Sequence, residues 1–457
     1  MAIRTLLFDI TSGRATLAMT AAVVFCYGWG AAALAAEPRD AVVPPAPTST
    51  EPTQSPLDES FGERTHAEWV RETRRQAWNQ TTFDVVLRSY YLSRHNFDDT
   101  RSEAWALGGW AGFKTGYFRE RFAFGATAYT SQSASADEDK DGTLLLAPGQ
   151  QGYSVLGELY GELLVTENIR VAGGRLGFDT PYINRIDNRM TPNTFEALMM
   201  RGLYGGGEGE AELRFGGGYV GAIKTRNSDR FDSMSQAAGA PDGVDRGVYV
   251  VGANYKTGGF SIGAINYYSD DIINIFYSEA KYAMPVGNDM RLQFAAQFGD
   301  QRSTGDDLLR GTGFSSHHWG IKGELAIGGA LFTTAYTTVS GDTGIHRPWG
   351  AYPGYTLVQV DDFSRDGEDA WMLRAGYSFQ TVKGLGLHAV WVNGSDPDLP
   401  TEYAHDEYNL DVQWAPPEGA LKGLQVRLRY SLIEQDDPMQ SEQSDFRVMV
   451  FYSPASL

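Results

Sequence analysis

The sequence has little cysteine, one long apolar run and a deficit of basic residues. Its single cysteine, Cys26, lies inside the apolar run, so a disulfide-stabilised fold is excluded. No second run reaches the roughly 18 apolar residues that a transmembrane helix needs, which excludes a helical membrane bundle. The 38 Lys and Arg residues stand against 57 Asp and Glu, and the resulting net charge of -19 argues against nucleic-acid binding.

The N-terminus has the features of an export signal. Arg4 and Arg14 precede the apolar run, and the small residues Ala35 and Ala36 end it. We therefore expect residues 1–36 to be a signal peptide. The alternative is a transmembrane anchor, which the short run and its small terminal residues disfavour.

A polar lead is expected to follow the signal peptide. Residues 37–56 are rich in Pro, Thr and Ser and lack aromatic residues, which is typical of disordered chain. Residues 62–78 carry charged side chains around a few small apolar ones, a pattern that fits one short helix. We predict that 37–80 is a disordered or partly helical periplasmic lead.

From residue 82 onward the hydrophobic pattern has a period of two. One face of the segment 83–91 is apolar and the other is polar, and the same alternation recurs at 212–224, 407–414 and 424–431. The chain holds 24 Tyr, 23 Phe and 10 Trp, yet its mean hydropathy is only -0.32. Strands with one apolar and one polar face account for both properties.

Short and long connections alternate along these strands. The short connections are expected at 119–120, 166–168, 205–209, 257–259, 285–289, 328–329, 381–384 and 416–420. The long, polar connections are expected at 132–151, 178–196, 226–246, 301–315, 341–369 and 393–405, with one tight hairpin at 269–271. Short turns on one rim and long loops on the other are typical of outer-membrane barrels. We predict an all-β fold, a transmembrane antiparallel β-barrel of about 18 strands, over residues 81–457.

Two further features agree with this fold. Aromatic residues occur where strands reach the short-turn rim, at the level of the lipid headgroups: Tyr117, Tyr204, Phe379, Trp414 and Tyr452. An open sheet edge is not tolerated in hydrocarbon, because each unpaired amide there costs several kcal/mol. The last strand, 446–452, should therefore pair with the first, 82–92.

Closure of the barrel would bring inward-facing basic residues together on one wall, with Arg374 a few strands away from the others. This predicted basic ladder consists of Arg88, Lys114, Arg374, Arg427, Arg429 and Arg447. A row of guanidinium groups attracts carboxylates, and each group can hold one bidentately and pass it on. The alternative is that these residues only pair with acids across the interior, such as Glu407 and Asp411.

The segment 178–196 is too polar for a core and too long for a hairpin turn. Loops of this length without secondary structure are usually functional. We predict that it folds into the barrel and narrows it, and that its charged residues line the constriction: Asp179, Arg185, Asp187, Arg189 and Glu196.

Several motifs together resemble the OprD family of substrate-specific outer-membrane porins. They are DNRMTPNTFEALMMRG (187–202), RPWGAYPGYT (347–356), DAWMLRAGYSF (369–379) and EGALKGLQVRLRY (418–430). The resemblance begins near residue 81. It implies an eighteen-stranded barrel in the bacterial outer membrane whose third and seventh external loops, here 178–196 and 341–369, fold inward.

The resemblance also implies that a basic ladder guides small carboxylate-bearing solutes, including amino acids, short peptides and aromatic acids. Arg427 and Arg429 lie within a matching motif, whereas the other ladder residues are assigned from strand parity. Two features depart from the family pattern. The lead 37–80 is not part of the resemblance, and the chain ends SPASL instead of on the aromatic residue that assembly machinery usually recognises.

Other functions are weaker hypotheses. An outer-membrane barrel enzyme, a protease or phospholipase, needs a nucleophile, a base and an orienting group in one place, and no such motif is present. A purely structural or adhesive barrel would have no use for a charged inward loop. Asp137, Asp139 and Asp141 imitate the start of a calcium loop, but Pro148 stands where a bidentate Glu should fall. We predict no enzyme activity, no metal and no cofactor.

The expected partners follow from the fold. They are outer-membrane lipid and lipopolysaccharide, small anionic or zwitterionic solutes, and the barrel-assembly machinery. Nucleic acid is not expected, and we expect a monomer or a weak trimer.

Overall fold

The computed structural model describes residues 57, 60, 65–287, 289–395, 397–398, 402–437 and 439–454. The predicted signal peptide and most of the polar lead lie outside the described residues. Within the described part of the chain, none of the helices has both the length and the apolar character that a membrane crossing demands.

One antiparallel sheet contains all nineteen strands of the described chain. Strand β8 (Asp232–Ser233) has two residues and belongs to a loop, so eighteen strands form the wall. They are β1 (Thr82–His95), β2 (Arg101–Lys114), β3 (Phe122–Ala136), β4 (Tyr153–Thr166), β5 (Ile169–Leu176), β6 (Thr194–Gly205), β7 (Glu212–Lys224), β9 (Val248–Thr257), β10 (Phe260–Ser269), β11 (Ile273–Pro285), β12 (Met290–Arg302), β13 (Ser315–Ile327), β14 (Ala330–Gly341), β15 (Asp369–Ser378), β16 (Leu385–Ser395), β17 (His405–Trp414), β18 (Leu424–Gln435) and β19 (Glu442–Tyr452).

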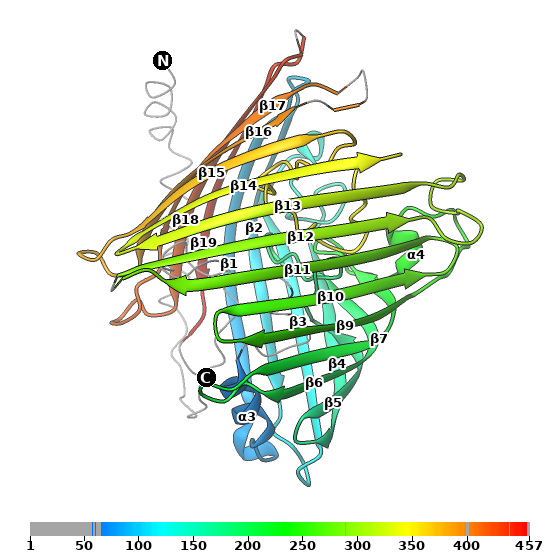
Figure 1. The fold of residues 1–457 in the computed structure, drawn as a ribbon, viewed down its shortest axis with the longest axis vertical. Coiled ribbons are helices and arrows are strands. Elements are labelled where there is room, and N and C mark those ends of the chain that lie inside the picture. The colour runs from blue at the N-terminus through cyan, green and yellow to red at the C-terminus, as the bar shows by residue number, and fades with distance from the viewer. Residues whose placement is uncertain are drawn as a thin grey trace.

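Four short helices complete the described elements. Two are α-helices, α3 (His66–Thr73) before the barrel and α4 (Met234–Ala237) beside β8, and two are 3-10 turns, η1 (Trp78–Gln80) and η2 (Glu138–Lys140). Helix α3 falls within the segment for which the sequence predicted one short helix. It lies at the lower end of the molecule in Figure 1.

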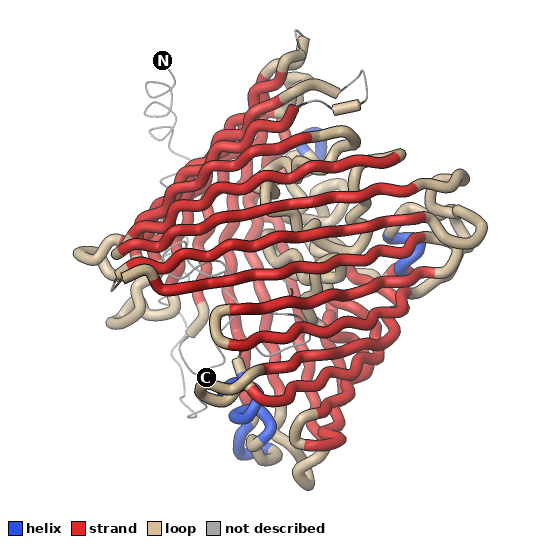
Figure 2. The backbone as a smooth tube through the Cα atoms, viewed as in Figure 1, coloured by secondary structure: helices blue, strands red, loops and turns tan. Residues whose placement is uncertain are grey.

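The sheet closes on itself. Strand β1 pairs with β19 in a register that runs from Leu87 opposite Tyr452 to His95 opposite Ser444, which confirms the predicted pairing of first and last strands. Short turns and long loops alternate around the wall as predicted, and Ser269 pairs with Ile273 across the expected tight hairpin. Figure 2 shows the strands as a continuous wall with loop segments inside it.

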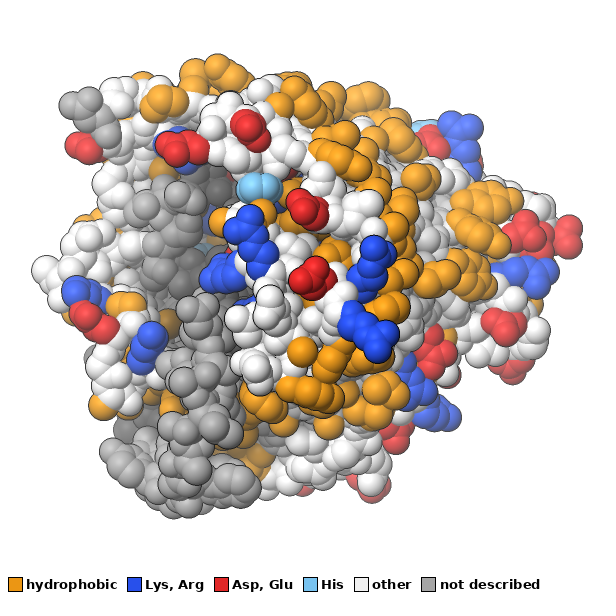
Figure 3. All heavy atoms as spheres, turned by 90° about the horizontal axis from the view of Figure 1, so that it is seen from below, with side chains coloured by type: hydrophobic (Ala, Val, Ile, Leu, Met, Phe, Trp, Pro, Cys, Tyr) orange, Lys and Arg blue, Asp and Glu red, His pale blue; other side chains and the backbone are white. Residues whose placement is uncertain are grey.

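The two faces of the wall differ in exposure. On β1, Phe83 and Leu87 are 50% and 42% exposed, whereas the alternating residues Arg88 and Tyr90 are 4% and 1% exposed. Figure 3 shows hydrophobic side chains over broad areas of the outer surface, with charged side chains in separate clusters. The apolar face of each strand is therefore the face that lipid covers.

The aromatic residues near the short-turn rim do not all face outward. Tyr204 is 45% exposed and stacks on Phe215, with 6.0 Å between ring centroids. Tyr117, in contrast, is buried and its hydroxyl donates to Glu162 in the interior, so its expected place in the outer aromatic belt was wrong. Strand β2 ends at Lys114, and the alternation of faces does not extend into the turn that follows.

The long loops 178–193 and 342–368 fold into the barrel, as the sequence predicted. Ile183 of the first loop forms a parallel bridge with Trp349 of the second, and the Trp349 Nε1 donates to the carbonyl of Met234 in α4 at 2.8 Å. Tyr182 and Tyr352 join these residues in the largest hydrophobic cluster. This cluster packs on β5–β7, β9–β11 and β14. The loops thus form a second, apolar layer against one part of the wall.

Gly109 on β2 offers a test of the wall geometry. Its φ is +125°, and a Cβ built there would lie 1.9 Å from the carbonyl oxygen of Val86 on β1. We expect Gly109→Ala to destabilise the barrel by about 1–3 kcal/mol, the usual cost of backbone strain. Urea unfolding in detergent, followed by the heat-dependent shift in gel mobility, measures this. Gly161→Ala on β4 is the control, because its nearest neighbour would be 3.9 Å away; equal stability of the two variants would contradict the register.

Candidate functional site

Neighbouring strands bring four of the predicted ladder residues to one part of the wall. Arg427 and Arg429 lie two residues apart on β18, and Arg429 is directly opposite Arg447 on β19. The residue between the first two, Leu428, is 38% exposed on the outer face, so both arginines point inward. Arg88 lies on β1, the next strand around the wall.

One carboxylate serves two of these arginines. The Nε atoms of Arg427 and Arg429 each lie 2.9 Å from Asp411 Oδ2 on β17, and Arg427 holds this carboxylate with two nitrogens. The imidazole of His388 lies 3.7 Å from the same carboxylate. The alternative interpretation is that these arginines only pair with acids across the interior. Asp411 carries one negative charge and Arg427 and Arg429 carry two positive charges, so one positive charge remains in excess among these three residues.

Arg447 and Arg88 hold the inward loops. Arg447 pairs with Asp445 on its own strand and donates to the carbonyl of Gln359 in the loop 342–368 at 3.1 Å. Arg88 binds both carboxylate oxygens of Asp187 in the loop 178–193, at 2.6 and 2.7 Å. Its guanidinium also lies over the rings of Trp110 and Phe451, which makes it a fixed anchor.

Two ladder candidates lie apart from this group. Arg374 on β15 is three strands from β18, and its Nε has no hydrogen-bond partner among the described residues. Lys114 is buried at the last residue of β2, where it pairs with Glu72 and Glu162. The structure therefore does not bring Lys114 together with the other ladder residues. The alternation of strand faces correctly predicted that Lys114 points inward, but it does not predict how far along the barrel axis a residue lies.

The charged residues of the constriction loop have different partners. Asp179 pairs with Arg185 at 2.6 Å within the loop. Arg189 is buried and its Nε donates to the carbonyl of Thr143 at 2.9 Å. Glu196 stands apart from them: it lies on β6 and pairs with Arg175 of β5, and its side chain is 45% exposed. The strand begins at Thr194, two residues earlier than the predicted end of the loop.

The sequence interpretation missed two loop arginines. Arg226 follows β7 and donates to Asn188 of the constriction loop, and it makes no ion pair within the described chain. Burial lowers the pKa of Arg226 to about 10, and repulsion from Arg447 acts in the same direction. Arg347, in the loop 342–368, pairs with Asp362. Both residues lie in long external loops, and an assignment that considers only the alternating faces of strands does not include loop residues.

Arginines from several loops thus converge near the wall arginines. The burial of Arg189 lowers its pKa, and the neighbouring charges of Arg447 and Arg226 lower it further. Arg226 in turn feels the charges of Arg447 and Arg347. The fold holds these arginine side chains close together although their positive charges repel one another. Such an arrangement is typical of a functional site that uses positive charge.

Two adjacent carboxylates in the loop 342–368 titrate differently. Burial raises the pKa of Asp362 to about 6, against the opposing attraction of Arg347. Burial also acts on Asp361, but contact with His405 at 3.0 Å outweighs it and lowers the pKa of Asp361 to about 2. Of these two carboxylates, Asp362 is therefore the one whose charge changes near pH 6.

A closed membrane-facing barrel of eighteen strands with loops folded inside it defines an outer-membrane channel. A family model described as "outer membrane porin, OprD family" matches residues 77–455. The chain belongs to the OprD family and is an outer-membrane porin. A search of curated proteins found no match.

Solved structures share the fold at low sequence identity. OccK9 (OpdG) of Pseudomonas aeruginosa superposes with a TM-score of 0.74 and 22% identity over 83% of this chain and 99% of that chain. OpdK of the same organism, solved with vanillate, gives 0.71 and 20% over 82% and 99%. A BenF-like porin from Pseudomonas fluorescens Pf-5 gives 0.72 and 19% over 83% and 100%.

The pKa of Asp362 predicts a pH-dependent ion preference. As pH falls through about 6, Asp362 gains a proton and loses its negative charge, so preference for chloride over potassium should increase. Reversal potentials in a KCl gradient, recorded from about pH 8 to about pH 5, measure this. Asp362→Asn should remove the step and show the acid-pH preference throughout. Asp361→Asn is the control and should keep the step, because Asp361 is already ionised over this range; a step that persists in Asp362→Asn would contradict the assignment.

Proposed function

We propose that this porin gives selective passage to small carboxylate-bearing solutes: amino acids, short peptides or aromatic acids. The solutes would move along the wall that carries Arg427, Arg429 and Arg447, past the constriction formed by the loop 178–193. The observation that carries the proposal is the sharing of one carboxylate, Asp411, by two inward guanidinium groups. An excess of fixed positive charge remains on this part of the wall.

The chemistry of transfer follows from the arginine side chain. A guanidinium binds a carboxylate through two parallel hydrogen bonds, and this geometry is lost if lysine replaces arginine. The Arg427–Asp411 contact already has this form within the protein, because Arg427 Nε donates to Oδ1 and Arg427 Nη2 donates to Oδ2. A solute carboxylate can compete with Asp411 for the same donors, so binding stays weak enough for release.

The remaining candidate residues have supporting roles in this proposal. Arg88 and Asp187 hold the constriction loop in place, and Asp179 with Arg185 stiffens it. Arg374 extends the path of positive charge away from β18. The vanillate in the OpdK structure is a small aromatic carboxylate, which agrees with the proposed solute class.

Residues 1–36 as a signal peptide, assembly by the barrel machinery, and a monomer or weak trimer stay predictions. Cleavage after Ala36 would leave a mature chain without cysteine.

Reversal of the wall charge tests the proposal. In Arg427→Glu/Arg429→Glu, four units of charge change on one strand, and carboxylate uptake should fall on the order of tenfold, since a charged channel concentrates ions of opposite sign by at least that factor. Liposome swelling with glutamate and with benzoate measures uptake, and single-channel recording measures conductance.

Arg119→Glu/Arg121→Glu is the matched control, because both residues are exposed in the β2–β3 turn. Its carboxylate uptake and its single-channel conductance should equal those of the natural protein. Unchanged uptake in the β18 variant would refute guided transport. Hydrolytic turnover in detergent without conductance would favour the competing interpretation, a barrel enzyme.

A further inference from the structure

The described residues that precede the family match, 77–455, reach deep into the barrel. Leu57 is 2% exposed and belongs to the largest hydrophobic cluster. The other members of this cluster are residues of the inward loops, such as Tyr182, and inward-facing strand residues, such as Val220. Leu57 is therefore packed inside the barrel, against the loops that narrow it.

Helix α3, further along the same lead, covers the inner face of the wall at the short-turn rim. Trp69 of α3 is buried, and its Nε1 donates to the carbonyl of Glu167 in the β4–β5 turn at 2.9 Å. The guanidinium carbon of Arg170 lies 4.0 Å from the centroid of the Trp69 ring. Arg170 is on the same face of β5 as Leu176, which belongs to the interior cluster. The tryptophan thus holds α3 against the interior side of the barrel.

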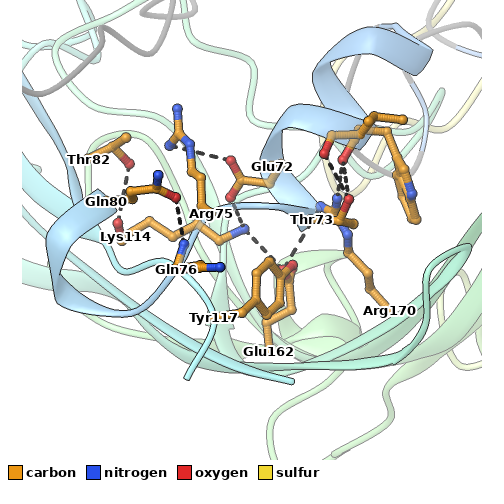
Figure 4. A network of polar contacts seen from close by, with 12 residues as sticks. Glu72, Thr73, Arg75, Gln76, Gln80, Thr82, Lys114, Tyr117, Glu162 and Arg170 are labelled. Atoms are coloured by element: carbon orange, nitrogen blue, oxygen red, sulfur yellow. Dashed lines mark hydrogen bonds and ion pairs between the residues drawn. The ribbon is translucent and has the colours of Figure 1, made fainter. Parts of the chain in front are cut away.

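An ion pair joins α3 to a second part of the inner wall, as Figure 4 shows. The carboxylate of Glu72 lies 2.8 Å from the Lys114 Nζ at the end of β2, and Glu162 of β4 lies 3.1 Å from the same nitrogen. Lys114 and Glu162 are each only 3% exposed. Inward-facing charged residues at the mouth of an open channel would contact water, whereas these two are covered by the lead.

The lead also touches the rim through its backbone. Tyr117 N–H in the β2–β3 turn donates to the Arg75 carbonyl at 2.8 Å, and Ala77 N–H donates to the Tyr117 carbonyl at 3.2 Å. At the other end of α3, a Cβ built on Gly206 of the β6–β7 turn would lie 3.0 Å from the His66 Cβ. The lead therefore contacts three successive periplasmic turns. Because it is covalently joined to β1, these contacts are intramolecular and keep it in place.

We propose that the N-terminal lead is a fixed internal plug that narrows the channel between the inward loops and the short-turn rim. The plug consists of Leu57 in the interior cluster and the segment 65–77 at the rim. It excludes bulky solutes because it fills volume, so it acts on neutral and charged solutes alike. The resulting size limit goes beyond the charge selection proposed above and does not depend on it.

Removal of the plug tests its effect on the size limit. A variant that lacks residues 41–76 keeps the predicted signal peptide and the whole segment that matches the family. The largest polyethylene glycol that enters the channel and lowers its single-channel conductance should be larger for this variant than for the natural protein. An unchanged polymer limit in a deletion variant that forms a heat-modifiable barrel would overturn the proposal.

Arg71→Gln/Arg74→Gln is the matched control for the deletion. Both side chains are exposed on α3, away from its contacts with the wall, so the polymer limit of this variant should equal that of the natural protein. A neutral polymer is the probe in both cases. The result therefore keeps its meaning if the β18 variant refutes guided transport of carboxylates.

Cysteine labelling tests the position of Leu57 in the full-length chain. In a Cys26→Ser background, Leu57→Cys should resist a maleimide coupled to a large polyethylene glycol as long as the barrel is folded. Ala67→Cys should react, because Ala67 is exposed on α3. Both variants should react after heat unfolding. Equal labelling rates in the folded protein would overturn the proposal, and this measurement decides it if the deletion variant does not assemble.

Discussion

The structure depends on one constraint: in hydrocarbon, every backbone N–H and C=O must find a partner within the protein. The pairing of β1 with β19 meets this constraint by closing the sheet. Closure gives the sheet an outer and an inner face. The outer face is apolar because it contacts lipid, and the inner face contacts the loops that fold into the barrel. The interior is filled by loops whose own apolar residues, such as Tyr182 and Trp349, pack on part of the wall.

Buried charge decides where those loops lie. An unpaired guanidinium inside the barrel would be costly, so Arg88 and Arg447 draw in Asp187 and the Gln359 carbonyl from separate loops. The wall arginines therefore divide into two groups. Arg88 and Arg447 position the loops, while Arg427 and Arg429 share Asp411 and retain excess charge. Loop position and charge selection thus rest on the same type of side chain.

The periplasmic rim uses the same chemistry. There the wall cations Lys114 and Arg170 meet a carboxylate and a tryptophan of α3, a helix outside the family match. Both inside the barrel and at its short-turn rim, cations of the wall bind segments that are distant in sequence. Arg88 and Asp187 are 99 residues apart, and Arg170 and Trp69 are 101 apart.

The sequence alone determined the barrel, its closure, the alternation of turns and loops, and the strand face that carries Arg88, Arg427, Arg429 and Arg447. It could do so because a strand alternates its faces with a period of two, which is a local property. Only the tertiary structure decided the partners: Lys114 with Glu72, Glu196 with Arg175, Tyr117 with Glu162, and Arg226 beside Asn188. The partners of these residues depend on how the loops and the N-terminal helix fold back across the wall. The alternation of residues along a strand is a local pattern and contains no information about that path.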